Sequence, residues 1–320
     1  MTLRVKSCFK EELYNYRDLL LSKGLKNVSI ERYMNYFDDF VNSQNVTEIV
    51  FTEEMIMKWL INKPGESNKT KNHRINWSRN FLIYLQSKGY KVCIPRRPKN
   101  INSRFQAYIF SNDEINKYFK FIDSYGSGKD PFIALCLPVI FRILYSCGTR
   151  VGETLKIKVK DVDLNKGIII LRHTKNEKTR MIPVSDELKG LLIKYTSKCL
   201  YLKTEDDYFF SHIDRRRIDE QSIYNFHRKA LNDADIKHAG RGEGPRLHDL
   251  RHTFAVNSLN QFEKNGCDLY NVLPILRQFL GHSKVTDTER YLQLSLANHD
   301  LVLNKTKETT IYLLGNENEK

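Results

Sequence analysis

The chain has 320 residues and a net charge of +14, with a pI of about 9.4, so a polyanionic partner such as nucleic acid is favoured. Its hydrophobic fraction of 41% suffices for two globular domains, no apolar run approaches the ~18 residues of a membrane helix, and the first residues form no signal segment. The six cysteines are scattered without a CxxC pair, which excludes a disulfide framework and a cysteine zinc site and favours a cytoplasmic protein.

The first quarter of the chain has the apolar spacing of helices. Apolar residues recur three and four positions apart, and Ser29 and Thr52 stand where helix N-caps would. The four predicted helices cover residues 10–24, 29–44, 51–63 and 68–89. We therefore expect a four-helix domain over residues 1–94, followed by a linker over residues 95–107.

Positive charge is concentrated where this domain meets the linker. No acidic residue lies between Glu66 and Asp113. The basic residues of this segment are Lys69, Lys71, Arg74, Arg79, Lys88, Lys91, Arg96, Arg97, Lys99 and Arg104. The fourth predicted helix can present the first four of them as a basic face, and Arg96 and Arg97 extend it into the linker. The alternative is a solvated segment that is merely basic.

The second domain, predicted over residues 108–300, mixes helices with a small sheet. Ser111 and Glu114 form a capping box that starts a helix, and an apolar core helix follows at 130–148. Two β-rich runs at 166–173 and 179–184 are joined by a hairpin. Further helices are predicted at 186–198, 219–234, 247–259, 271–281 and 286–295. The fold is therefore expected to be mainly α with a small antiparallel sheet. Residues 301–320 are expected to be a C-terminal tail that ends in the polar stretch "LLGNENEK".

The stretch "HDLRH" allows two kinds of site. In a helix, His248 and His252 would lie one turn apart, as two zinc ligands do, whereas His248 and Arg251 would share a face suited to a phosphate. A zinc protease helix carries Glu after its first His, where this chain has Asp249, and Arg251 would place a positive charge beside the metal. We therefore expect no metal here. A third interpretation is a pair of histidines packed in a core.

Three other stretches supply what a phosphate site needs. Arg150 stands in "GTRVGE" at the start of a helix, Lys175 lies at the hairpin tip, and His282 in "LGHS" precedes Tyr291 in "ERYLQL". Each residue alone is a weak signal. Together with "HDLRHTF", their types and order closely resemble the tyrosine recombinase (phage integrase) family, whose pattern is Arg, a hairpin Lys, His-x-x-Arg, His or Trp, and Tyr. The resemblance covers residues 108–300.

The resemblance implies a SAM-like, four-helix, DNA-core-binding domain and an α+β catalytic domain. It implies a site-specific DNA recombinase or integrase that needs no cofactor. Its partners would be double-stranded recombination sites, with a dimer on each site and a homotetramer on synapsed DNA, in the cytoplasm at the nucleoid. The alternatives are a catalytically inactive DNA-binding regulator with the same fold and a type IB topoisomerase-like activity.

The resemblance also implies how the phosphodiester is broken. Tyr291 would attack the scissile phosphate and form a 3′-phosphotyrosyl link. Arg150 and Arg251 would hold the non-bridging oxygens with permanently charged, planar groups. Lys175 would protonate the departing 5′-oxygen. These roles explain why the site contains a nucleophile, two fixed cations and a proton donor.

The remaining residues of the motifs are expected to assist. By the same resemblance, His248 is the general base toward the tyrosine and His282 hydrogen-bonds the phosphate. Glu153, three residues after the first arginine, supports Arg150. We expect a structural role for His252 and a packing role for Tyr270.

Overall fold

The computed structural model describes residues 4–24, 27–99, 107–125, 131–172, 179–199, 203–238, 240, 244–282, 284 and 286–297. The chain divides into two compact units, Met1–Phe105 and Gln106–Lys320, and the division falls inside the segment predicted as a linker. Within the described ranges no helix is long and apolar enough to cross a membrane. The hairpin residue Lys175 and the predicted tail lie outside the described residues.

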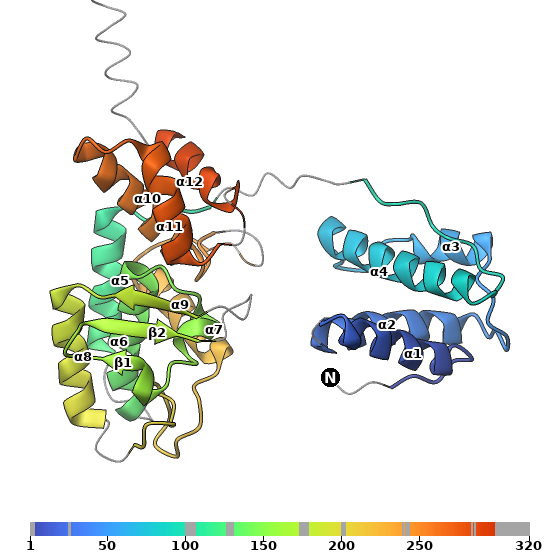
Figure 1. Ribbon diagram of the computed structural model, residues 1–320, viewed down its shortest axis with the longest axis horizontal. Helices are drawn as coiled ribbons and strands as arrows, with labels where there is room; N and C mark the ends of the chain where they lie inside the picture. Colours follow the sequence, from blue (N-terminus) through green and yellow to red (C-terminus); the bar gives the residue numbers. More distant parts are fainter. Residues whose placement is uncertain are drawn as a thin grey trace, which may run out of the picture. The chain divides into compact units, whose positions relative to one another are not determined.

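The first unit consists of the four helices that the apolar spacing predicts (Figure 1). They are α1 (Lys10–Ser22), α2 (Asn27–Ser43), α3 (Glu53–Trp59) and α4 (Asn68–Ser87). Helices α1 and α2 lie side by side, and both contact α4. Their core is aromatic: the Phe37 ring lies 5.6 Å from that of Phe9 and 5.3 Å from that of Phe81. Thr52 caps α3 as predicted, whereas Ser29 lies inside α2, which begins two residues earlier.

Arg74 is a structural residue of this unit, so its prediction as part of the exposed basic face is wrong. It is 1% exposed. Its Nε and Nη2 donate to the two carboxylate oxygens of Glu66, at 2.8 and 2.7 Å. Its Nη atoms also donate to the carbonyls of Trp59 and Ile61. A guanidinium that joins α4 to the end of α3 in this way cannot turn outward to a phosphate, because its donors already have buried partners.

We expect the Arg74→Ala substitution to destabilise the first unit. It leaves the Glu66 carboxylate and two carbonyls without their buried donor, and breaking a buried ion pair typically costs about 3–5 kcal/mol. Chemical denaturation of the full chain, followed by circular dichroism, measures this loss. Lys71→Ala, on the same helix, is the control and should change stability by less than about 0.5 kcal/mol. Equal effects of the two substitutions would contradict the structural role.

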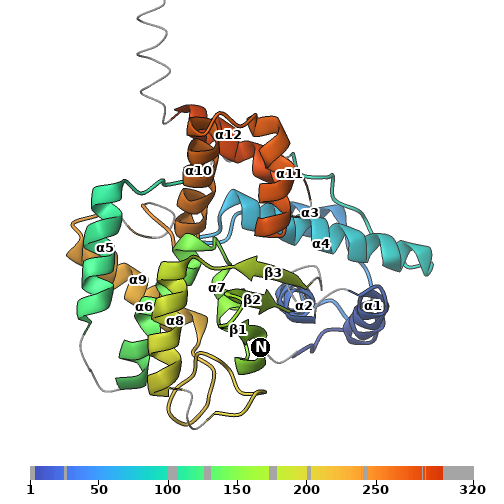
Figure 2. The same cartoon turned by 60° about the vertical axis from the view of Figure 1, so that its left-hand side comes forward.

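The second unit contains helices around a three-stranded antiparallel sheet of order β1-β2-β3. The strands are β1 (Val162–Asp163), β2 (Ile168–Leu171) and β3 (Arg180–Pro183). Ile169 pairs with Ile182, and both are buried in the core that also contains residues of α6 and α8 (Figure 2). The sheet and the mainly helical fold are as predicted, except that β1 was missed because two residues are too few to show a periodicity.

The described helices of this unit pack around α6 and α10. In chain order the helices are α5 (Asn112–Ser124), α6 (Pro131–Ser146), α7 (Val151–Thr154), the 3₁₀ helix η1 (Val159–Asp161), α8 (Asp186–Cys199), α9 (Glu220–Asp233), α10 (Asp249–Lys264), α11 (Leu269–Leu280) and α12 (Thr286–Ala297). Helix α6 packs against α5, α8 and α10. Helices α10, α11 and α12 contact one another at one end of the unit and share a small core (Figure 1).

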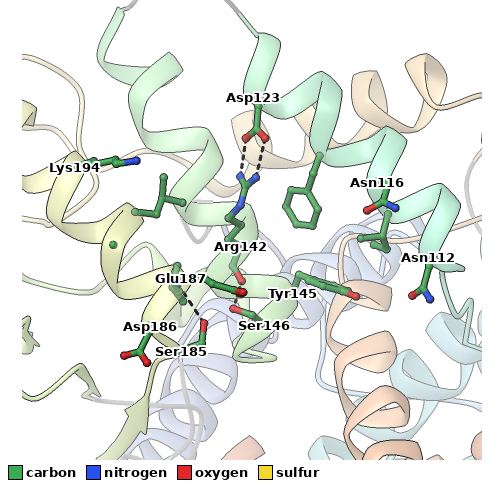
Figure 3. Close-up of a pocket in the computed structure, with 15 residues that line it drawn as sticks. Asn112, Asn116, Asp123, Arg142, Tyr145, Ser146, Ser185, Asp186, Glu187 and Lys194 are labelled. Atoms are coloured by element: carbon green, nitrogen blue, oxygen red, sulfur yellow. Dashed lines mark hydrogen bonds and ion pairs between the residues drawn. The ribbon is translucent and has the colours of Figure 1, made fainter.

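A pocket of about 880 Å³ lies between α5, α6 and the start of α8 (Figure 3). Arg142 crosses it and forms a two-pronged ion pair with Asp123, at 2.6 and 2.7 Å. Phe119 and Leu191 belong to its apolar lining. None of the predicted site residues that the structure describes lines this pocket, so the predicted chemistry must be sought elsewhere.

Candidate active site

The site begins with a carboxylate that holds two arginines. Arg150 is the residue before α7, and Glu153 lies in the first turn of that helix. Glu153 accepts from Arg150 Nη1 at 2.6 Å and from Arg180 Nη2 at 2.7 Å. Burial of Glu153 favours a higher pKa, but Arg180 and Arg150 outweigh it, so the pKa lies below its usual value. The pairing of Arg150 with Glu153 that the sequence indicated is therefore present, and it fixes the guanidinium.

Arg180 was not predicted, although it belongs to the same cluster. It begins β3, and its side chain is mostly buried. Arg180 also passes so close to Gly281 that an added Cβ there would lie 2.8 Å from its Nη1. Gly281 further has a φ of +68°, which a glycine adopts without strain. A single arginine in a short strand carries no sequence signal that distinguishes it from a surface residue.

Arg251 is buried where three segments meet. It is 1% exposed, and its Nη1 and Nη2 donate to the carbonyls of Gly148 and Leu280, at 2.7 and 2.8 Å. Desolvation, and then repulsion from Arg150, lower its pKa to about 10. Among the described residues its buried Nε has no hydrogen-bond partner. An incoming anion would therefore give this Nε a partner and offset the repulsion between Arg251 and Arg150.

Tyr291 lies in the small core between α10, α11 and α12. It is 2% exposed, and its hydroxyl is 3.1 Å from His252 Nδ1. Its ring stacks on that of His282, with centroids 5.9 Å apart, and His282 Nδ1 is 2.9 Å from the Thr288 hydroxyl. Burial raises the pKa of Tyr291, while Arg251 and then Arg150 oppose that rise. The tyrosine and the two arginines therefore act on one another electrostatically.

Of the two histidines in "HDLRH", the structure places His252 against the Tyr291 hydroxyl. His248, predicted as the base beside the tyrosine, precedes α10 and is exposed. Its ring centroid lies 4.8 Å from that of His252, whose Nδ1 is the ring nitrogen near the Tyr291 hydroxyl. Although His248 is exposed to solvent, desolvation by the protein atoms around it, and then His252 and Arg251, lower its pKa. Tyr270 was also misjudged: it is 78% exposed and packs in no core.

The basic face of the first unit retains five of its six predicted residues. Lys69, Arg96 and Arg97 are exposed. Lys71 donates to Asn62 at 2.5 Å, and Arg79 donates to the Pro95 carbonyl at 2.9 Å, with both side chains half-buried. Both acceptors are neutral, so these hydrogen bonds do not neutralise the positive charges of Lys71 and Arg79.

We expect this basic face to carry much of the salt dependence of DNA binding. Each neutralised phosphate contributes about −0.9 to the slope of log K against log salt concentration. Replacing Lys69, Lys71 and Arg79 together by alanine should therefore flatten that slope, measured by fluorescence anisotropy on duplex DNA, by up to about 3. Lys194→Ala, an exposed lysine of the second unit, is the control. An unchanged slope in the triple variant would place the DNA elsewhere.

Comparison with known proteins assigns the chain to one family. The model of the phage integrase family matches residues 109–297, which include every described residue of the cluster. This chain belongs to that family and is a tyrosine-type, site-specific DNA recombinase. The class that the motif order indicated is thus confirmed.

Curated relatives match nearly the whole chain. The tyrosine recombinase XerC of Thermodesulfovibrio yellowstonii is 27% identical over 86% of this chain and 89% of its own length. The tyrosine recombinase XerA of Saccharolobus solfataricus is 28% identical over 89% of each chain. The similarity therefore includes the first, helical unit as well as the second.

Solved structures share the fold. XerH site-specific recombinase bound to its difH substrate, before cleavage, has a TM-score of 0.63 and 19% identity, over 82% of this chain and 75% of that one. A lambda integrase dimer bound to a core site has a TM-score of 0.60 and 17% identity, over 87% and 96% of the two chains. At these identities the likeness concerns the fold alone.

Proposed function

We propose that this recombinase cuts and rejoins DNA strands through a 3′-phosphotyrosyl link made by Tyr291. The single observation that carries the proposal is the position of that hydroxyl. It lies in a cluster with two histidines and two arginines, and both arginines lower its pKa against the effect of burial. A tyrosine that merely packs in a core needs no such surroundings.

Each residue of the cluster has a distinct task in this proposal. Arg150, held by Glu153, and Arg251, through its unpaired Nε, bind the non-bridging oxygens of the scissile phosphate. His282 adds a hydrogen bond to the same phosphate. Because charge builds up on these oxygens as the tyrosine attacks, fixed cations stabilise the transition state more than the ground state.

The reaction conserves the energy of the broken bond. The Tyr291 oxygen forms a bond to phosphorus, and the bond from phosphorus to the 5′-oxygen breaks. Lys175 supplies a proton to that oxygen, which leaves as a hydroxyl. In the reverse direction a 5′-hydroxyl, from the same or another strand, displaces the tyrosine and restores the phosphodiester. No high-energy cofactor is needed, and religation to a different strand is recombination.

The assembly we propose is a dimer on each recombination site and a homotetramer on two synapsed sites, acting in the cytoplasm on the nucleoid. The lambda integrase structures with detectable similarity include a dimer on a core site and a tetramer on a Holliday junction. A single copy has one tyrosine cluster among its described residues, so exchanging four strands requires four copies.

The test is to trap the covalent link on a DNA site recovered with the protein itself. Genomic fragments that the purified chain binds are sequenced, and their shared site is made as a duplex nicked beside the cleavage position, so that the short 5′-product diffuses away. We expect a denaturation-resistant protein–DNA complex whose DNA-bearing peptide contains Tyr291. Binding without any covalent complex would favour a DNA-binding regulator, and relaxation of supercoiled DNA without strand exchange would favour a topoisomerase.

A further inference from the structure

Helix α10 carries a carboxylate, Asp249, and a histidine, His252, and the histidine lies against Tyr291. Asp249 and His252 are three residues apart, so their side chains project from one face of the helix. On one side of the imidazole, Nδ1 is 3.1 Å from the Tyr291 hydroxyl. On the other side, Nε2 is 4.0 Å from Asp249 Oδ1. The three groups thus stand in the order carboxylate, imidazole, hydroxyl.

Asp249 is buried with one oxygen uncommitted. It is 1% exposed, and its Oδ2 accepts from the backbone N–H of Arg246 at 2.7 Å. Its Oδ1, the oxygen that faces the imidazole, has no hydrogen-bond partner within the described residues. Burial raises the pKa of Asp249 to about 6. A buried, unpaired carboxylate oxygen is costly, and a positive charge on His252 would relieve that cost.

We propose that Asp249, His252 and Tyr291 form a proton relay in which His252 is the general base for the nucleophile. The inference rests on the function proposed above, in which Tyr291 attacks the phosphate. It moves the role of base from His248, where the motif pattern placed it, to the histidine that touches the reacting oxygen. Asp249 is the positioning residue of the relay, because it acts only through His252.

The relay balances in both directions. As the Tyr291 oxygen bonds to phosphorus, its proton passes to Nδ1 of His252, whose Nε2 already bears a proton. The resulting imidazolium is stabilised by the carboxylate of Asp249, and Asp249 itself stays deprotonated. During religation the tyrosine oxygen leaves phosphorus and takes the same proton back from Nδ1. This division of tasks is that of the serine-protease triad, with tyrosine in place of serine.

The charges around His252 keep it in the form that the relay needs. Desolvation, followed by Arg251, Arg246 and Arg290, lowers its pKa to about 4. The imidazole is therefore neutral above about pH 4, so the lone pair of one ring nitrogen is available to the Tyr291 hydroxyl. The charged and titratable groups that face it are Asp249, Arg251 and His248 on or beside its own helix and Arg246 in the preceding loop. Arg290 and Tyr291 on α12, and His282 before that helix, complete the set among the described residues.

The first experiment compares His252→Asn with His248→Asn on the nicked substrate. Asparagine keeps an acceptor near the position of Nδ1 but cannot take a proton at neutral pH. We expect His252→Asn to slow single-turnover formation of the covalent complex by about 10²–10⁴-fold, the usual worth of a general base. Its rate should rise about tenfold for each pH unit from 7 to 9, because hydroxide replaces the lost base, whereas the wild-type rate stays flat over this range, which lies above the pKa of Asp249. His248→Asn should slow the reaction but keep the flat profile.

Asp249→Asn tests the positioning role. It removes the charge that stabilises the imidazolium, so the rate should fall while the profile stays flat, and DNA affinity should not change. A residue that only supported the fold would lower the melting temperature and the affinity together. If Asp249→Asn cleaves at the wild-type rate, Asp249 has no part in the relay.

A second measurement needs no variant that might misfold. In the wild-type chain with ¹⁵N-labelled histidine, the nitrogen shifts of His252 report which ring nitrogen bears the proton. The relay requires a proton on Nε2 and none on Nδ1. If Nδ1 bears the proton, it donates to Tyr291 and cannot act as a base, so the relay is wrong whatever the variants do.

The outcomes separate this inference from the function on which it rests. If the wild-type chain forms no link through Tyr291, the proposed function fails. If the wild-type chain forms that link and His252→Asn matches its rate with a flat pH profile, only the relay fails. If the pH-dependent rate appears in His248→Asn instead, the base is His248, as the motif pattern suggested.

Discussion

Replacing Tyr291 by phenylalanine should abolish the covalent protein–DNA complex and leave DNA binding nearly unchanged. The phenol oxygen is the nucleophile in the proposed reaction, and no other atom of the side chain takes part. The ring keeps its packing between α10, α11 and α12, so the variant loses only the interactions of the hydroxyl with His252 and Arg251, and a typical hydrogen bond is worth about 0.5–1.5 kcal/mol. Denaturing electrophoresis of the nicked duplex measures the link, and anisotropy measures the binding.

Tyr270→Phe is the matched control for this experiment. Tyr270 is the second residue of α11 and is 78% exposed. Removing its hydroxyl should affect neither the link nor the binding. A Tyr291→Phe variant that still forms the complex, with the link mapped to another residue, would show that the nucleophile had been misassigned.

The second large effect is expected at Lys175, which lies outside the described residues. A general acid matters most when the leaving group is poor, since it supplies the proton that makes departure feasible. Lys175→Ala should therefore cleave ordinary DNA about 10²–10⁴-fold more slowly. A 5′-bridging phosphorothioate leaves as a thiolate and hardly needs the proton, so most of the rate should return on that substrate.

Arg150→Ala supplies the contrast. Arg150 is expected to stabilise the non-bridging oxygens, whose charge builds up whatever group departs. Its variant should therefore stay slow on both substrates, which single-turnover rates will measure. If sulfur rescues both variants alike, or neither, Lys175 is a phosphate contact, and Lys178 in the same segment becomes the candidate for the proton donor.

The linear sequence was sufficient for the fold and for the class of protein. Helices follow from apolar residues three and four positions apart, and the sheet follows from "GIIIL" and "RMIPV", because local periodicity reflects which face of an element is buried. The order of Arg150, "HDLRH", His282 and Tyr291 was sufficient for the family. These signals are short-range or depend only on order, so they can be read without coordinates.

Only the tertiary structure showed which of two similar arginines is buried in an ion pair. Arg74 and Arg79 differ by five positions in one helix, yet only Arg74 meets a buried carboxylate, and that carboxylate comes from the loop before the helix. Periodicity reports that a face is buried, but not which charged partner the next segment brings to it. The sequence therefore predicted a basic face of six residues, and the structure buries one of them, Arg74.

The same limit applies to the two histidines of "HDLRH". His248 and His252 are one helical turn apart, and the sequence gives no reason to expect His252 rather than His248 beside Tyr291. The choice depends on where α12 places Tyr291 against α10, a packing of helices whose residues lie 39 positions apart. Such a contact arises from the burial of a shared apolar core. Motif order was sufficient to predict a DNA recombinase, whereas only the packing of that core decided which histidine of "HDLRH" contacts Tyr291.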